Sequence, residues 1–366
     1  MFMKFYIIIT LFFSALFLNS CKEDIELVGD FNETAIVYGI LDQADSVHFL
    51  KINRAFIGPG NAIEFAQIPD SSYFENLTAT ITEKISGQIS RTWTLNDTII
   101  NNKDENGIFY APTQKLYYFE HGMSNNESLN PEATYNLNII INEGTAKEFI
   151  VTGETTLIDG LTSGQSNPNA TFQFLDNQKE FKAFGVCVSD VGNAKLVNVS
   201  LKLNFEEYTI NNDTNKISID WNVGESEVSN NFSAVIQGER FYELIQENVT
   251  NDDNIIQRKF KSIQIVITGG SDDLNTYISS NEPSNSLTQS KPDFTNLSSN
   301  SDNNVIGVFT SRQTLTINKL YYSSNVPTAS CLDSKSREYL CTGSITGTLL
   351  FCSDHNSDAL KTYFCQ

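Results

Sequence analysis

Apolar residues follow two different patterns along this 366-residue chain. Residues 5–18 (FYIIITLFFSALFL) form one uncharged apolar run behind the basic Lys4. From residue 32 onward, the apolar residues instead fall in short segments rich in Val, Ile, Thr, Tyr and Phe, separated by Gly, Asn, Ser and Pro. Short segments of this composition and spacing are typical of the strands of a β-sandwich. The pattern therefore predicts a mainly β protein behind a hydrophobic leader.

Residues 32–159 are predicted to form an immunoglobulin-like or fibronectin-like β-sandwich domain. Turn residues at Ser86-Gly87, Asn106-Gly107 and Glu143-Gly144 separate neighbouring apolar segments, as expected for hairpins. Seven strands are expected, at residues 35–41, 47–53, 78–84, 89–95, 115–120, 135–142 and 148–152.

A second β-rich domain is predicted at residues 171–328, after a linker at 160–170 that is rich in Gly, Ser and Asn. Two short helices are expected within it. Residues 238–249 place apolar side chains at helical spacing, and residues 272–280 follow Ser271 as a candidate N-cap. A polar loop is expected at 281–304, and residues 329–366 form a Cys-rich C-terminal segment. Strands are expected at residues 171–175, 181–188, 197–205, 217–221, 232–236, 260–268, 305–311 and 315–322.

The apolar run at residues 5–18 predicts export. It has fourteen residues, whereas a helix that spans a bilayer needs about twenty. Residues 1–20 are therefore interpreted as a signal peptide that is cleaved before Cys21. Leu18-Asn19-Ser20-Cys21 resembles the bacterial lipobox, in which the Cys sulfur receives lipid. Several acyl chains on Cys21 would hold the protein on a membrane; the alternative is an ordinary signal peptide that happens to precede a Cys.

Residues 21–31 are predicted to be an acidic tether. Lys22, Glu23 and Asp24 resemble the export signal of Bacteroidota lipoproteins, which directs them to the outer face of the outer membrane. The alternative is a solvated acidic segment with no targeting role. We therefore expect an outer-membrane protein that is lipid-anchored and faces the cell exterior.

The formal net charge of −20 restricts the partners of the chain. Nucleic-acid binding needs clustered Lys and Arg, so a nucleic-acid partner is not expected. Docking on an anionic lipid surface is disfavoured for the same reason. The membrane is thus expected to be contacted through the N-terminal lipid alone.

Four of the six cysteines lie in the last 36 residues, at Cys331, Cys341, Cys352 and Cys365. In an exported protein this clustering predicts two disulfides, with three possible pairings. Zinc is the alternative, but the spacings lack the close Cys pairs of a tetrahedral site. Cys187, in an apolar segment, is expected to be a buried free thiol.

No catalytic, metal or cofactor site is predicted, so the protein is not expected to be an enzyme. His48, His121 and His355 lie in no known catalytic motif, and residues 102–107 resemble an EF-hand loop but lack its bidentate Glu at the twelfth position. The acidic pairs 206–207, 252–253 and 272–273 are interpreted as solvated surface charge. Ser46 and Thr98 follow Asp and precede an apolar residue, which is the pattern of O-glycosylation in Bacteroidota.

Several segments resemble a family of uncharacterised Bacteroidota lipoproteins, those that carry the domain of unknown function called DUF4249. The resemblance implies a partner of TonB-dependent outer-membrane transporters, with no catalytic residues and no cofactor. It rests on Cys21 with its tether, residues 36–41 (IVYGIL), 49–54 (FLKINR), 107–110 (GIFY), 129–137 and 305–309, and the segment that begins at Cys331.

These features favour a non-enzymatic surface lipoprotein that binds a ligand or a membrane-protein partner. Two alternatives remain open. The first is a structural or adhesive surface protein in which the sandwich acts as a spacer. The second is a hydrolase whose acidic site is assembled from residues far apart in the sequence.

Overall fold

The structure is a computed structural model that describes residues 33–55, 62–107, 109–122, 127–164, 171–228, 230–281, 294–320 and 331–365. Strands account for 53% of the residues and helices for 14%, so the predicted mainly β class is confirmed. The predicted signal peptide, Cys21 and the residues Lys22, Glu23 and Asp24 lie outside the described residues.

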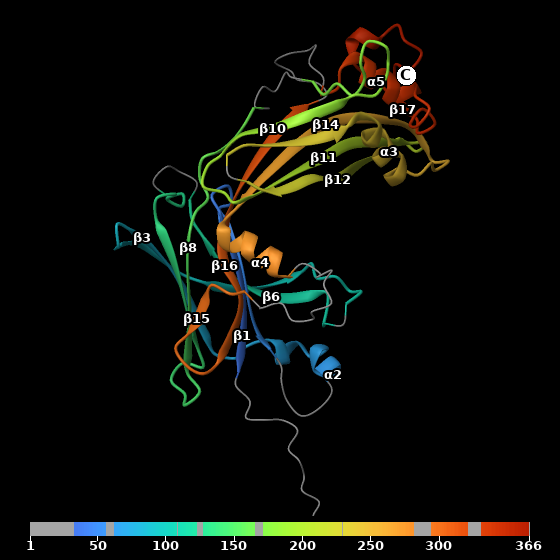
Figure 1. The fold of residues 1–366 in the computed structure, drawn as a ribbon. Helices are drawn as coiled ribbons and strands as arrows, with labels where there is room; N and C mark the ends of the chain where they lie inside the picture. The colour runs from blue at the N-terminus through green and yellow to red at the C-terminus, as the bar shows by residue number, and fades with distance from the viewer. Residues whose placement is uncertain are drawn as a thin grey trace, which may run out of the picture.

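A two-layer β-sandwich occupies the end of the molecule where the described chain begins (Figure 1). Its strands are β1 (Thr34–Asp42), β2 (Val47–Ala55), β3 (Leu77–Ile85), β4 (Gln88–Thr94), β5 (Asn96–Asn101), β6 (Thr113–Glu120), β7 (Thr134–Ile141), β8 (Phe149–Thr156), β15 (Leu297–Ser299) and β16 (Asn304–Leu320). One layer is a five-stranded sheet in the order β15-β8-β7-β3-β4. The other is the β16-β1-β2-β6-β5 part of a nine-stranded sheet.

The alternation of apolar and polar residues explains why these strands face each other. In β7, Tyr135, Leu137, Ile139 and Ile141 are buried, whereas the residues between them are only partly buried. Successive side chains of a strand point to opposite faces, so β7 presents one apolar face to the opposite sheet. The β3–β4 turn at Ser86 and Gly87 has positive φ at both residues, as the hairpin prediction requires.

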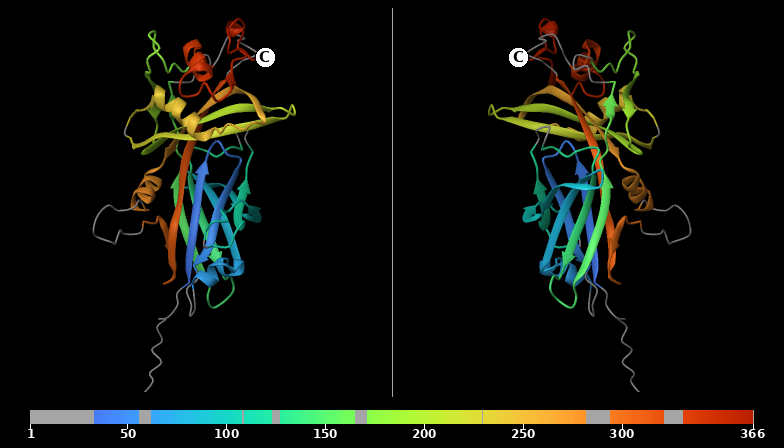
Figure 2. Two further views of the ribbon diagram at one scale, coloured as in Figure 1. Left: turned by 90° about the vertical axis from the view of Figure 1, so that its right-hand side faces the viewer. Right: turned by 90° about the vertical axis from the view of Figure 1, so that its left-hand side faces the viewer.

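A second β-rich layer lies at the opposite end of the molecule (Figure 2). Its strands are β9 (Leu161–Ser163), β10 (Ala183–Val191), β11 (Leu196–Thr209), β12 (Thr214–Glu227), β13 (Phe232–Gln237), β14 (Ile255–Gly270) and β17 (Phe351–Cys352). The long strands β12, β11 and β14 continue the nine-stranded sheet, and β13-β10-β9 form a separate three-stranded sheet. The helical elements of the described chain are α2 (Ala62–Ala66), η2 (Pro69–Ser72), α3 (Gly238–Asn248), α4 (Asp272–Asn281), α5 (Ser334–Thr342) and η3 (Asn356–Asp358).

Both helices predicted from the sequence are present. In α3, Phe241, Leu244 and Ile245 are buried together, as their spacing predicted. The hydroxyl of Ser271 accepts a hydrogen bond from the backbone N–H of Leu274 at 3.1 Å, so Ser271 caps α4. The sequence did not predict α2 or α5.

Strand β16 connects the two ends of the molecule. Its first half pairs in parallel with β1, from Asn304 to Arg312, and its second half pairs antiparallel with β14, from Arg312 to Leu320. The prediction of two separate strands at 305–311 and 315–322 was therefore wrong, because the polar residues between them continue the ladder. The predicted strand at 171–175 was also wrong, since only isolated bridges form there.

The hydrophobic core has two clusters. One lies in the sandwich and takes its residues from 35–157 together with Leu297 and Phe309, and the other lies in the second layer and takes its residues from 158 onward. However, β15 and β16 join the sandwich from residues 297–320, which the sequence assigned to the second domain. The division into domains at 32–159 and 171–328 stays a prediction. Within the predicted linker, residues 161–163 form β9, and residues 165–170 lie outside the described residues.

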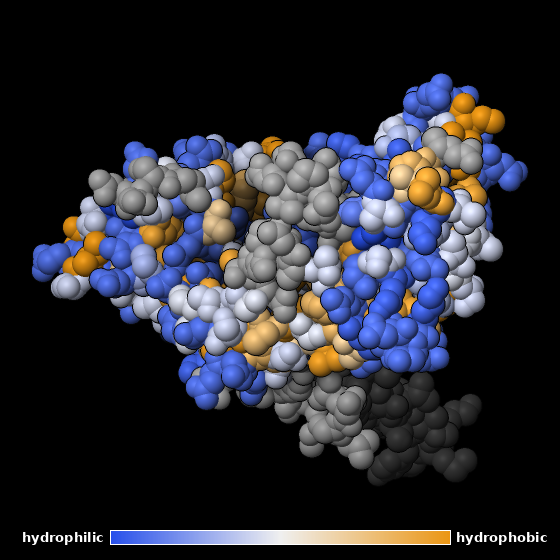
Figure 3. All heavy atoms as spheres, turned by 90° about the horizontal axis from the view of Figure 1, so that it is seen from above, coloured by the Kyte–Doolittle hydropathy of each residue, from blue (hydrophilic) through white to orange (hydrophobic). Residues whose placement is uncertain are grey.

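The surface shown from the C-terminal end is mostly hydrophilic, with apolar side chains in separate groups (Figure 3). Within the described ranges, no helix has the length and apolar character needed to cross a bilayer.

Replacing Gly307 with Ala should strongly destabilise the protein. Gly307 has φ +107°, and a Cβ at this position would collide with the carbonyl oxygen of Val37 on β1. We expect a loss of about 3 kcal/mol in the free energy of unfolding, measured by urea denaturation.

Gly87→Ala is the matched control. Gly87 also has positive φ (+78°), but nothing lies within 4 Å of the position that a Cβ would take there, so the cost should be about 1 kcal/mol. Equal losses in the two variants would contradict a close approach of β1 and β16 at Gly307.

Candidate functional site

A concave pocket lies on the outer face of the sandwich, where the β1–β2 hairpin meets two connecting segments. Its volume is about 260 Å³, and we call it the cationic pocket. Its lining residues are Ile36, Lys51, Asn53, Arg54, Ala55, Pro69, Ser72, Tyr73, Lys103, Phe109 and Tyr110.

The alternation of side chains along β2 determines which residues form the floor of the pocket. Leu50 and Ile52 of β2 are fully buried in the sandwich core, so the alternating residues Lys51 and Asn53 point to the outer face. The antiparallel register pairs Asn53 with Ile36 of β1, which brings the two side by side on that face.

Hydrogen bonds hold the two connecting segments that form the walls. The backbone N–H of Tyr110 donates to the carbonyl oxygen of Ala66 at 2.9 Å, which joins the β5–β6 connection to α2. The backbone N–H of Lys115 donates to the Tyr73 hydroxyl at 3.0 Å, which holds the segment after η2 against β6. These bonds fix the side chain of Tyr73 and the backbone of Tyr110.

Among the described residues, the lining carries three cations and no acidic residue, although the whole chain has 44 acidic and 24 basic residues. Arg54 has a partner, because its Nη1 lies 3.9 Å from a carboxylate oxygen of Glu33. Lys51 and Lys103 have no carboxylate within 4 Å among the described residues. The Nζ of Lys103 instead donates to the carbonyl oxygen of Tyr110 at 2.7 Å and lies 5.4 Å from the centroid of the Phe109 ring.

The two lysines interact unfavourably with each other. Burial lowers the pKa of Lys103, and the nearby positive charge of Lys51 lowers it further. Two ammonium groups of like sign in a partly desolvated concavity favour an incoming anion, because an anion would offset both effects. Such an arrangement can bind a negatively charged group.

Two polar side-chain atoms of lining residues are buried without a hydrogen-bond partner among the described residues. They are Oδ1 of Asn53 and Nε of Arg54. Buried polar atoms in folded proteins are usually paired, and an unpaired one costs about 1–3 kcal/mol. Both atoms have almost no solvent-accessible surface, so a ligand in the cationic pocket would not reach them.

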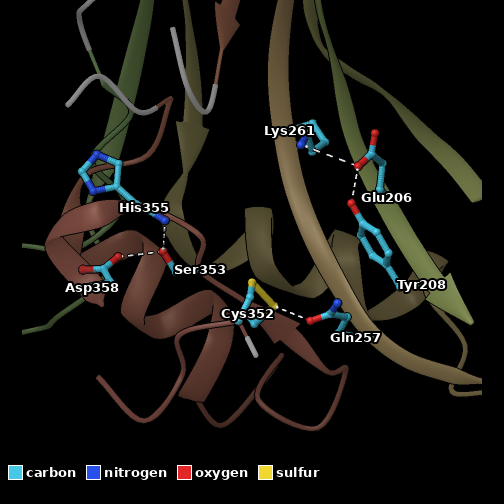
Figure 4. Close-up of a disulfide and its surroundings, with 9 residues drawn as sticks. Glu206, Tyr208, Gln257, Lys261, Cys352, Ser353, His355 and Asp358 are labelled. Carbon is cyan, nitrogen blue, oxygen red and sulfur yellow. Dashed lines mark hydrogen bonds and ion pairs between the residues drawn. A yellow bond between two sulfur atoms is a disulfide. The ribbon is translucent and has the colours of Figure 1, made fainter. Parts of the chain in front are cut away.

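The Cys-rich segment contains one disulfide, not the two that were predicted. Cys352 and Cys365 are bonded, with their Cα atoms 5.0 Å apart (Figure 4). Cys331 and Cys341 are free thiols buried in the second core cluster, where burial raises the pKa of Cys341 to about 12. Both thiols pack among the apolar side chains of that cluster.

Cys187 was predicted to be buried, and this was wrong. It lies on β10 with its side chain exposed. The buried neighbours Val186 and Val188 point to the other face of the strand, so alternation places the thiol outward.

Serine, histidine and aspartate side chains meet beside the disulfide without forming a catalytic triad. The Ser353 hydroxyl donates to the Asp358 carboxylate at 2.8 Å and accepts the backbone N–H of His355 at 3.2 Å (Figure 4). In a triad the imidazole lies between the hydroxyl and the carboxylate. Here Asp358 instead pairs with the buried guanidinium of Arg337 at 2.9 Å, which lowers the pKa of Asp358 despite its burial.

The remaining motifs lie apart from the cationic pocket, with one exception. Residues 102–107, the segment that resembles an EF-hand loop, connect β5 to β6 in a hairpin and supply Lys103 to the pocket. Ser46 is exposed in the β1–β2 turn and Thr98 is partly buried on β5, and their O-glycosylation stays a prediction. No group of three or more His, Cys, Asp or Glu suited to a metal occurs in the described parts of the chain.

The two carboxylates of the acidic pair 206–207 do not converge on one site. Glu207 pairs with the buried Arg258 at 2.8 Å, while Glu206 accepts the Tyr208 hydroxyl at 2.8 Å and lies 3.6 Å from the Lys261 ammonium. The two carboxylates of this pair therefore have separate partners within the second layer.

Two of the three histidines pair in the sandwich core. Nε2 of His48 lies 3.0 Å from Nε2 of His121, and Nδ1 of His121 lies 2.8 Å from the carbonyl oxygen of Gly122. A carbonyl oxygen only accepts, so His121 carries its proton on Nδ1 and accepts at Nε2 from His48.

The chain matches no protein-family model, and no curated protein matches it. The resemblance to DUF4249 lipoproteins stays a prediction.

Acid should destabilise the protein through His48. Burial, followed by the charge of His121, lowers the pKa of His48 from 6.5 to about 4, and the nearby Asp42 opposes this only in part. Between these values the unfolded state binds more protons than the native state, so stability falls as the pH falls from 6.5 to 4. The expected loss from this residue is about 3 kcal/mol.

The variant His48→Leu tests whether His48 causes the loss of stability in acid. Urea denaturation at several pH values should give a shallower pH dependence between 6.5 and 4 for the variant than for the wild type. The same slope in both proteins would show that another group is responsible.

Proposed function

We propose that this protein is a non-enzymatic, lipid-anchored lipoprotein of the outer membrane that faces the cell exterior and binds a small anionic ligand in the cationic pocket. The observation that carries ligand binding is the pair of lysines, Lys51 and Lys103, with no acidic residue among the described residues of the lining. In a chain with a net charge of −20, an exclusively basic concavity is best explained by an anion that it recognises.

The location is supported by the sequence before the described residues. Cys21 follows a lipobox-like segment, and Lys22, Glu23 and Asp24 resemble a surface-export signal. Ile36 of the pocket is fifteen residues from Cys21, so an extended tether would keep the pocket within about 50 Å of the lipid. A ligand held there would be close to the outer membrane, where a TonB-dependent transporter is the partner that we propose.

The disulfide-bonded segment lies at the end of the molecule opposite the start of β1 (Figure 1). On a membrane-anchored chain the pocket would thus be on the tethered half, and the Cys-rich segment on the distal half. This arrangement favours a role of the pocket near the membrane surface.

Lipid attachment is tested by Cys21→Ala in the native host. Metabolic labelling with palmitate should label the wild type and not the variant, because no other residue receives the lipid in this proposal. Replacing Lys22, Glu23 and Asp24 together with Ala should keep the label but protect the protein from protease added to intact cells. Palmitate label retained in Cys21→Ala would contradict the anchor.

Anion binding is tested by titrating the purified protein with acetate and inorganic phosphate while NMR records backbone amide shifts. Shifts should concentrate at β2 and at residues 103–110. Lys51→Gln and Lys103→Gln should each lower the affinity about tenfold, the typical contribution of one charged hydrogen bond.

Lys216→Gln is the control, because it removes the same charge from an exposed position of β12 far along the sheet. Its affinity should equal that of the wild type. Equal effects of all three variants would mean that the binding reflects net charge and not the pocket.

A further inference from the structure

The walls of the cationic pocket are mostly apolar, although its charge comes from basic side chains. Six of the eleven described lining residues are apolar or aromatic, namely Ile36, Ala55, Pro69, Tyr73, Phe109 and Tyr110. A small hydrated anion such as acetate would contact the ammonium groups and leave most of these walls in water. An anion with an apolar body would also cover the walls, and the burial of apolar surface strengthens binding. The ligand that suits the whole pocket is therefore both charged and apolar.

The charged and the aromatic parts of the pocket are adjacent. The Nζ of Lys103 lies 5.4 Å from the centroid of the Phe109 ring and donates to the carbonyl oxygen of Tyr110 at 2.7 Å. An anionic group that binds this ammonium group is thus brought close to the Phe109 ring. Because this separation is short, the apolar body of the ligand must begin next to its charged group.

An aromatic ring suits these walls better than a saturated ring. Phe109 is 49% exposed, so a ligand can contact its ring, and Tyr73 and Tyr110 border the same pocket. Contact between two aromatic rings contributes more than the buried area alone, because the edge of one ring is attracted to the face of the other. The volume of about 260 Å³ lies just below the usual range for ligand pockets, about 300–1,000 Å³, so the ligand is small.

The lysines favour a carboxylate over a phosphate. A carboxylate has two oxygens that accept hydrogen bonds, which gives one for each of Lys51 and Lys103. A phosphate group has three such oxygens and more negative charge, so it would leave an oxygen against the apolar walls.

We infer that the ligand is a small aromatic carboxylate, a single aromatic ring that bears its carboxylate directly or through a short apolar link. This inference rests on the proposed function, since it names the ligand class of the same pocket. Lys51 and Lys103 bind the carboxylate, and Phe109 packs against the ring.

The experiment is a calorimetric titration of the full chain with benzoate, acetate, cyclohexanecarboxylate, benzamide and phenyl phosphate. Benzoate should bind about tenfold more tightly than acetate, because its ring buries apolar surface. It should also bind more tightly than cyclohexanecarboxylate, which has the same charge but a thicker, saturated ring. Benzamide has nearly the shape of benzoate without its charge, so it should bind about tenfold more weakly than benzoate.

A pair of matched variants tests whether the ring contacts the pocket. Phe109→Ala should weaken benzoate binding about fivefold to tenfold, and by a larger factor than it weakens acetate binding. Phe49→Ala is the control, because Phe49 of β2 is exposed to nearly the same extent (47%) but is not among the described lining residues. Its affinity for benzoate should equal that of the wild type. The comparison of ligands on the wild-type protein stands even if a variant does not fold.

Each contrary outcome has a distinct meaning. If benzoate binds no more tightly than acetate or cyclohexanecarboxylate, and anion binding still depends on Lys51 and Lys103, the aromatic inference is overturned and anion binding stands. Tighter binding of phenyl phosphate than of benzoate would overturn the carboxylate in the same way. If no anion binds, or if binding is insensitive to both lysines, the proposed function fails together with the inference.

Discussion

The structure depends on a single strand that belongs to both of its layers. β16 runs through seventeen residues, first beside β1 and then beside β14, so one hydrogen-bonded ladder joins the sandwich to the second layer. The change of partner occurs near Arg312. There the buried carboxylate of Asp42 accepts from Nε of Arg312 at 3.0 Å and from the hydroxyl of Thr314 at 2.6 Å. Because a buried carboxylate must be paired, Asp42 restricts the point at which β16 leaves β1.

The position of the cationic pocket follows from this constraint. β1 lies between β16 and β2, so the register of β1 on β16 also determines which face of the hairpin is buried. With Leu50 and Ile52 in the core, Lys51 and Asn53 must point outward. A slip of one residue would reverse these faces and place an ammonium group in the core, which would cost several kcal/mol. The same packing that stabilises the sandwich therefore orients the groups that we assign to the ligand.

Local patterns predicted much of the secondary structure, because alternation and helical spacing are set by neighbouring residues. They identified most strands of the sandwich and the buried face of α3. They could not predict that β1 pairs in parallel with residues about 270 positions later, since no local signal encodes that partner. The N-cap Asp333, whose side chain accepts from the N–H of Ser336, is a local signal for the start of α5 that the sequence prediction did not include. The pocket could not be predicted from local patterns either. Lys51 and Lys103 are far apart in the sequence and become neighbours only when β5, β6 and the β1–β2 hairpin have assembled.

The negative net charge of the chain and the positive charge of the pocket act on an approaching anion over different distances. At physiological ionic strength charges are screened beyond about 8 Å, so an approaching anion experiences the many surface carboxylates only over a short range. Within the pocket the nearest charges are Lys51 and Lys103, partly desolvated and therefore weakly screened. Net charge would then reduce the rate at which anions arrive, whereas the pocket would determine which anions remain bound. Selection therefore acts at short range, where the charge of the ligand meets the two lysines.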